Sequence, residues 1–118
     1  MNARESGARA EDAACAYLSA HGYEIAARNL RLGRGELDIV ARRDGVTAFV
    51  EVKYRTGARF GAPAEAVTPA KRRRILDAAL CYAAQAGLLD APLRFDVIEV
   101  TPGAIRHIPG AFDATGLV

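Results

Sequence analysis

The most constraining feature of this 118-residue sequence is an apolar run that carries two opposite charges, Phe49-Val50-Glu51-Val52-Lys53. Because the side chains of a β-strand alternate between its two faces, Glu51 and Lys53 point to one side and Val50 and Val52 to the other. So apolar a run is typical of a central strand. We therefore expect both charged side chains inside the protein, where they need partners.

A second carboxylate lies in a similar run just upstream, in Leu37-Asp38-Ile39-Val40. Strict alternation predicts that Asp38 and Val40 share one face of this strand, and that Leu37 and Ile39 share the other. The dipeptide Asp44-Gly45 follows, and it is a typical two-residue hairpin turn. The two charged runs are therefore expected on neighbouring antiparallel strands, which would bring Asp38 close to Glu51.

The remaining patterns predict two helices and one or two further strands around this hairpin. We expect a helix over 4–21, strands over 23–33, 36–42 and 46–54, a helix from Thr68 to Ala86, a strand over 93–100 and a short edge strand over 104–108. Residues 55–66 show no period and are expected to form a long loop, and the tail from about residue 109 is expected to pack loosely. The fold class is α/β: one domain spanning 1–118, with a mixed sheet flanked by helices.

The distribution of charged residues along the sequence supports a nucleic-acid partner more strongly than the net charge does. Sixteen basic and 14 acidic residues leave a net charge of only +2. The second helix, however, begins with the cationic run Lys71-Arg72-Arg73-Arg74. Lys71 lies one turn before Ile75 on the apolar stripe and is expected to point inward, with the three arginines fanned outward. Such a run is either a solvated face or a contact surface for phosphates.

The expected location is cytoplasmic, with no membrane partner. The N-terminus lacks the apolar segment of a signal peptide, and no apolar run is long enough to cross a membrane. The two cysteines show no metal-binding spacing.

One acidic residue of the first helix stands out, because Glu11 lies in line with Ala14 and Leu18 and not on the polar side. It is either the partner of an arginine from a neighbouring strand or a residue of the site. Asp96, in the fourth strand, is expected to be a structural partner of Arg28 or Arg94.

The paired carboxylates suit a hard divalent cation. Mg²⁺ or Mn²⁺ takes oxygen ligands, often one or two carboxylates with substrate phosphates and water, and Asp38 and Glu51 can supply the pair. Lys53 would hold an attacking water or stabilise charge on a phosphate, and Glu11 would be an additional ligand, directly or through water. The alternative is an ion pair that buries Glu51 and Lys53 as structure alone.

In this order, Glu11, Asp38, Glu51 and Lys53 resemble the signature of the PD-(D/E)xK nuclease superfamily, and within it the archaeal Holliday junction resolvases. More closely, the chain from about Gly7 to Phe112 resembles the YraN-like (UPF0102) family of small bacterial proteins. The residues that carry this likeness are Asn29-Leu30-Arg31, Gly35-Glu36-Leu37-Asp38, Phe49 to Arg55, Lys71 and Arg94-Phe95-Asp96-Val97. Leu37 stands where the superfamily name has Pro, a residue that matters there for chain geometry and not for chemistry.

The resemblance implies a restriction-endonuclease-like α/β core, with Asp38 and Glu51 as metal ligands, Lys53 as the catalytic lysine and Glu11 as the acid on the helix. The leading hypothesis is therefore a Mg²⁺- or Mn²⁺-dependent endonuclease acting on DNA, with branched DNA as one candidate substrate and, for that substrate, a homodimer. We expect the DNA backbone to contact Lys71, Arg72, Arg73, Arg74 and Arg55. Two alternatives stay open: a non-catalytic adaptor that binds nucleic acid or protein, and a structural ion-pair cluster with another function.

Overall fold

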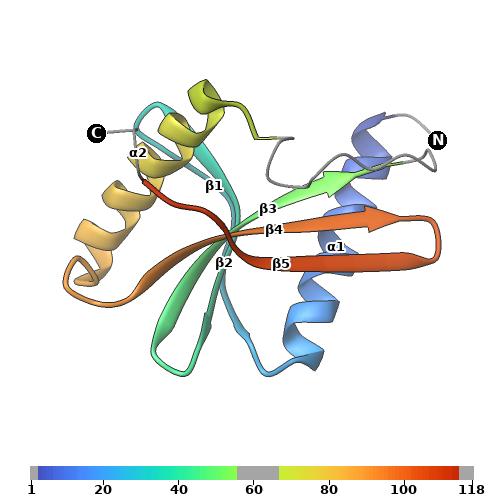
Figure 1. Ribbon diagram of the computed structural model, residues 1–118, viewed down its shortest axis with the longest axis horizontal. Helices are drawn as coiled ribbons and strands as arrows, with labels where there is room; N and C mark the ends of the chain where they lie inside the picture. Colours follow the sequence, from blue (N-terminus) through green and yellow to red (C-terminus); the bar gives the residue numbers. More distant parts are fainter. Residues whose placement is uncertain (1–2, 56–66, 115–118) are drawn as a thin grey trace.

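The computed structural model describes residues 3–55 and 67–114. Its elements, in chain order, are α1 (Ala3–Ala20), β1 (Glu24–Leu32), β2 (Gly35–Arg43), β3 (Val46–Tyr54), α2 (Pro69–Ala86), β4 (Leu93–Thr101) and β5 (Ala104–Phe112) (Figure 1). This order confirms the predicted α/β class and agrees with a nuclease-like core. The predicted loop over 55–66, apart from Arg55, lies outside the described residues.

The five strands form one mixed sheet in the order β1-β2-β3-β4-β5, so the apolar strand β3 is central, as predicted. β3 pairs with β4 in parallel, and the other three pairings are antiparallel. The hairpin between β2 and β3 has positive φ at both turn residues, 52° at Asp44 and 78° at Gly45. Asp and Gly tolerate this geometry, and its twist matches that of the flanking strands.

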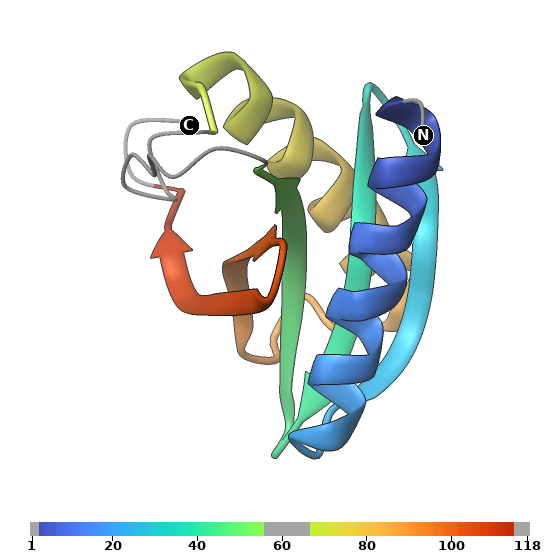
Figure 2. The same cartoon turned by 90° about the vertical axis from the view of Figure 1, so that its right-hand side faces the viewer.

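The two helices cover opposite faces of the sheet (Figures 1 and 2). Ala48 and Val50 of β3 pack with residues of α1 in one buried cluster, and Phe49 packs with residues of α2 in the other. Glu51 therefore points to the α2 face, by the alternation of the strand. Within the described ranges, neither helix is long and apolar enough to cross a membrane.

The start of α2 is tightly defined, which fixes the position of Lys71. The side chain of Thr68 accepts a hydrogen bond from the backbone N of Lys71, 3.2 Å away, and Pro69 occupies the first turn. These are the preferred N-cap and first-turn residues of a helix. Gly87, with φ of 71°, ends the helix in the left-handed conformation, just after the predicted last residue Ala86.

The last strand is longer than predicted, and the expectation of a loose tail is wrong for residues 109–112. β5 extends to Phe112, whose ring is buried and stacks on Phe95 with centroids 5.2 Å apart. Gly110, with φ of 62°, donates its backbone N–H to Asp96 at 3.0 Å. These partners lie 14 or more residues away along the chain, so no local pattern predicts the pairing.

Asp96 is fully buried and joins β4 to β5 through hydrogen bonds. Arg94 donates to both of its carboxylate oxygens at 2.7 and 2.8 Å, and His107 Nε2 lies 2.8 Å from Oδ2. Arg94 also donates to the hydroxyl of Tyr23 at 2.7 Å, so the predicted partnership with Arg94 is confirmed. Burial raises the pKa of Asp96, but the hydrogen bonds from His107, Arg94 and Gly110 outweigh it and hold the pKa below its usual range.

Candidate active site

The site begins where β2 and β3 part. Their pairing extends from Arg43 opposite Val46 to Ile39 opposite Val50 and ends there. One step further, the backbone N of Val52 donates to Asp38 Oδ2 at 2.9 Å, so a side chain takes the place of the strand ladder. Asp38 is thereby held at the fork between the two strands, next to Glu51.

The alternation of side chains changes at this fork. Leu37 packs in the cluster on the α2 face, and Ile39 packs in the cluster on the α1 face. The prediction that these two residues share a face is therefore wrong. Asn29, which lies between the same register pairs as Asp38, has a positive φ of 50°. A left-handed residue interrupts the regular period of its own strand, so β1 is irregular at the level where Asp38 of β2 accepts a hydrogen bond from β3.

Three charged side chains meet beside Asp38 on the α2 face. Glu51 is 5% exposed, and its Oε1 lies 2.5 Å from Lys71 Nζ and 3.6 Å from Lys53 Nζ. The sequence predicted that Lys71 points inward but assigned it only to a DNA phosphate. Its place one helical turn before Ile75 was the signal that it belongs to this cluster.

The electrostatics of the cluster follow from crowding. Burial, and then the neighbouring Glu51 carboxylate, raise the pKa of Asp38 from 3.8 to about 7, although the hydrogen bond from Val52 opposes them. Burial and the nearby Lys71 lower the pKa of Lys53. Burial lowers the pKa of Lys71 too, but its contact with Glu51 outweighs this and raises it. Such opposed shifts are typical of functional sites, though ion-pair networks produce them as well.

Glu11 lies outside this cluster. Its Oε1 accepts a hydrogen bond from Arg28 Nε at 3.2 Å, which is the ion pair with a neighbouring strand that the sequence left open. In the described part of the chain, no group of three or more His, Cys, Asp or Glu side chains could hold a metal. The candidate metal site therefore has two carboxylates there, Asp38 and Glu51, and not the three that the sequence suggested.

The predicted DNA contacts fall into two groups. Arg73 and Arg74 are exposed on α2, as expected. Arg72 is half-buried, because its Nε donates to the Val67 carbonyl at 2.9 Å and its guanidinium lies over the ring of Phe112. Arg55 lies near a buried carboxylate of β4, with its Nε 3.8 Å from Glu99 Oε2. Arg72 and Arg55 thus have structural partners.

The carboxylate pair has the chemistry that Mg²⁺ or Mn²⁺ requires. Half-buried Asp38 and buried Glu51 repel each other, and the raised pKa of Asp38 reflects its partial burial and then this repulsion. A divalent cation would relieve it, and two protein carboxylates are a common protein contribution when phosphates and water complete the shell. Lys53 and Lys71 contact the same oxygen of Glu51, so a cation there would compete with them.

Comparisons with known sequences place these residues in a family. The profile described as "Uncharacterised protein family UPF0102" matches residues 10–100. A UPF0102 protein of Symbiobacterium thermophilum is 50% identical, with 94% of this chain and 98% of that protein covered. A UPF0102 protein of Lachnoclostridium phytofermentans is 48% identical, with coverage of 98% and 99%, and one of Geobacter metallireducens is 44% identical, with 96% of each covered.

Proposed function

The chain belongs to the uncharacterised protein family UPF0102, and we propose that it is a nuclease that hydrolyses DNA phosphodiesters with the help of Mg²⁺ or Mn²⁺. The observation that carries this proposal is the placement of Asp38 beside Glu51, where burial and then the neighbouring carboxylate raise the pKa of Asp38 to about 7. A structural ion-pair cluster has no need of two crowded carboxylates, since one would satisfy the lysines. Perturbed groups of this kind are a functional signature.

Asp38 and Glu51 would hold the metal, which when bound would polarise a phosphodiester and lower the pKa of a coordinated water. Val52 fixes the carboxylate of Asp38 through its backbone N–H, so one ligand is positioned before any substrate arrives. The parallel pairing of β3 with β4 holds Glu51 in the centre of the sheet. The protein side of the site is thus preorganised by the backbone.

The two lysines would handle charge and protons. Lys53, with its lowered pKa, is suited to orient a water molecule and to exchange a proton with it. Lys71, with its raised pKa, stays charged and is suited to stabilise negative charge on a phosphate oxygen. The different neighbours of the two ammonium groups thus support different roles on one face of the sheet.

The proposed substrate is DNA in the cytoplasm, with branched DNA as the form to test first. A four-way junction has two strands to cut, so an enzyme for that substrate would work as a homodimer with two sites. Light scattering of the protein with and without junction DNA would measure this assembly.

A cleavage assay with matched variants tests the proposal. A four-way junction, a linear duplex and a supercoiled plasmid are incubated with Mg²⁺ or Mn²⁺. We expect cleavage by the native protein and its loss in both Glu51→Gln and Lys53→Met. Glu24→Gln, which removes an exposed carboxylate from β1, should cleave normally. Equal residual cleavage by all four proteins would identify a contaminant and refute the assignment. If a protein that combines Glu51→Gln and Lys53→Met is as stable as the native protein without metal, the charged cluster is structural.

A further inference from the structure

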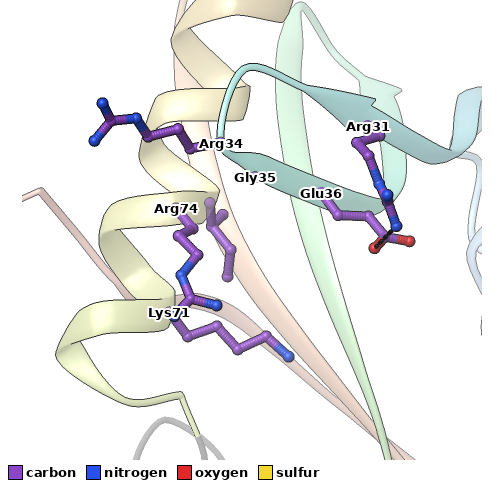
Figure 3. A pocket seen from close by; sticks show the side chains of 7 residues that line it. Arg31, Arg34, Gly35, Glu36, Lys71 and Arg74 are labelled. Carbon is purple, nitrogen blue, oxygen red and sulfur yellow. Dashed lines mark ion pairs between the residues drawn. The ribbon is translucent and has the colours of Figure 1, made fainter.

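Two adjoining hollows lie between the β1–β2 turn and α2, next to the candidate active site. Their volumes are about 410 and 360 Å³, and Arg34 and Arg74 line both. Figure 3 shows Lys71 and Arg74 on the α2 side of the first hollow and Arg31 on the hairpin side. We call the two hollows together the basic groove, after the cationic residues along it, Arg31, Arg34, Lys71, Arg73 and Arg74.

The walls of the basic groove are held together by close contacts. Gly35, the first residue of β2, lies so near α2 that a Cβ there would overlap the carbonyl of Arg74. Beside it, the backbone N of Arg34 donates to Asp77 Oδ2 of α2 at 3.0 Å. The turn is thus fixed on the helix at two points, and the groove is a preformed feature of the fold.

Positive charge in the basic groove is only partly neutralised. Its five cations face two carboxylates, Glu36 and Asp77. Glu36 Oε2 lies 3.8 Å from Arg31, and both side chains are well exposed, so this pair contributes little. Over the described ranges, no carboxylate forms an ion pair with the side chains of Arg34, Arg73 or Arg74. A concave surface with unpaired guanidinium groups favours an anionic ligand.

The chemistry of the lining indicates which anion. Among the described residues along the two hollows there is no aromatic ring for a base to stack on, and no Asn or Gln side chain to read a base edge. Guanidinium groups pair well with phosphates. Lys71 lines the groove and also contacts Glu51, so the groove borders the candidate active site.

We propose that the basic groove binds the sugar–phosphate backbone of duplex DNA, holding phosphates that flank the one presented to Asp38 and Glu51. This inference rests on the proposed function for the choice of DNA. Binding there depends on charge and not on base sequence. Arg31 exchanges its weak contact with Glu36 for a phosphate, so Glu36 at the rim opposes binding.

Salt-dependent binding measures the contribution of each side chain. The probe is a fluorescein-labelled 20-base-pair duplex, titrated by anisotropy in EDTA over about 50–300 mM NaCl, a range in which phosphate contacts change affinity strongly. Each phosphate contact contributes about 0.9 to the slope of log K against log salt, so losing one weakens binding about eightfold at 0.1 M salt. We expect this loss in Arg34→Ala and in Arg74→Ala, a smaller effect in Arg34→Lys, and tighter binding in Glu36→Gln.

The controls separate this proposal from the proposed function. Arg42→Ala removes an exposed arginine at the far end of β2 and should leave the slope unchanged. Glu24→Gln, which removes an exposed carboxylate from β1, should bind the duplex as the native protein does. The proposal that the groove binds DNA is refuted if Arg34→Ala and Arg74→Ala both keep the native affinity and salt slope, or if the native protein does not bind the duplex. If the arginine variants lose duplex binding but the native protein shows no metal-dependent cleavage, the nuclease proposal is refuted and the DNA-binding role of the groove is supported.

Discussion

Replacing Asp38 with Asn should make the metal-free protein more stable while it destroys the metal site. The Asn side chain has nearly the shape of Asp, its Oδ1 can still accept the hydrogen bond from Val52, and its amide can donate toward Glu51. The substitution removes one of two crowded charges and keeps the contacts of the fork. Most substitutions destabilise a protein, so a gain here would be a specific signature of this crowding.

The magnitude and its pH dependence follow from the pKa of Asp38. A rise from 3.8 to about 7 corresponds to a cost of about 4 kcal/mol for the ionised form in the folded protein. Because the pKa is raised on folding, the contribution of this carboxyl to stability is complete below about pH 4 and is lost as the pH rises to about 7. Allowing for relaxation around the pair, we expect Asp38→Asn to add about 2–3 kcal/mol at pH 8 and about 1 kcal/mol at pH 5.

Urea unfolding of the native protein and Asp38→Asn at pH 5 and pH 8, in EDTA, measures both values. Asp90→Asn, an exposed carboxyl before β4, controls for the loss of one negative charge and should change stability by less than about 0.5 kcal/mol. Saturating Mn²⁺ should then stabilise the native protein and not Asp38→Asn. A variant that is less stable than the native protein, by an amount that does not depend on pH, would refute the crowding argument.

Three further substitutions test the surroundings of the site by urea unfolding. Lys71→Met should cost about 1–2 kcal/mol at pH 7, because it removes the nearest cation from buried Glu51; no loss would show that this contact is not formed. Asp96→Asn should lower the free energy of unfolding by about 3 kcal/mol at pH 7. Because the pKa of Asp96 is lowered on folding, this loss of stability should shrink as the pH falls below about 4. A loss that does not change with pH would contradict the hydrogen-bond network around Asp96. Gly35→Ala should cost about 2 kcal/mol or more, because the new methyl group overlaps the Arg74 carbonyl; a neutral change would contradict this close approach.

The elements that sequence reasoning located well are those with local causes. Asp44-Gly45 adopts the two positive φ angles of its turn, and Thr68 and Gly87 mark the two ends of α2. Strong apolar character placed β3 at the centre of the sheet. Each of these depends on the intrinsic preferences of a few neighbouring residues.

The features that the sequence did not predict depend on contacts between distant residues. At the fork, Asp38 accepts a hydrogen bond from Val52 of another strand, and at the end of β5 the ring of Phe112 stacks on Phe95. Lys71 was expected to point inward, but its partner Glu51 is 20 positions away and on the central strand. A helical period predicts the direction of a side chain and not the identity of the group that it meets.

The same limit applies to the third acid. Glu11 lies on the inward stripe of α1, as the period predicted, and there it meets Arg28 of β1. The register of β1 beside α1 decides this pairing, and no pattern within the helix reveals it. The order of charged residues along the chain thus indicated Asp38, Glu51 and Lys53 correctly as neighbours and overestimated the number of carboxylates in contact.

The central claim is that Asp38 and Glu51 hold a divalent metal, and a calorimetric titration with Mn²⁺ tests it most directly. The native protein and Asp38→Asn are titrated alone and with a saturating four-way junction, and the heat from the junction itself is subtracted. The account predicts that the native protein binds Mn²⁺ at a site that Asp38→Asn lacks, with the junction strengthening this binding. Identical titrations of both proteins, alone and with the junction, would contradict it.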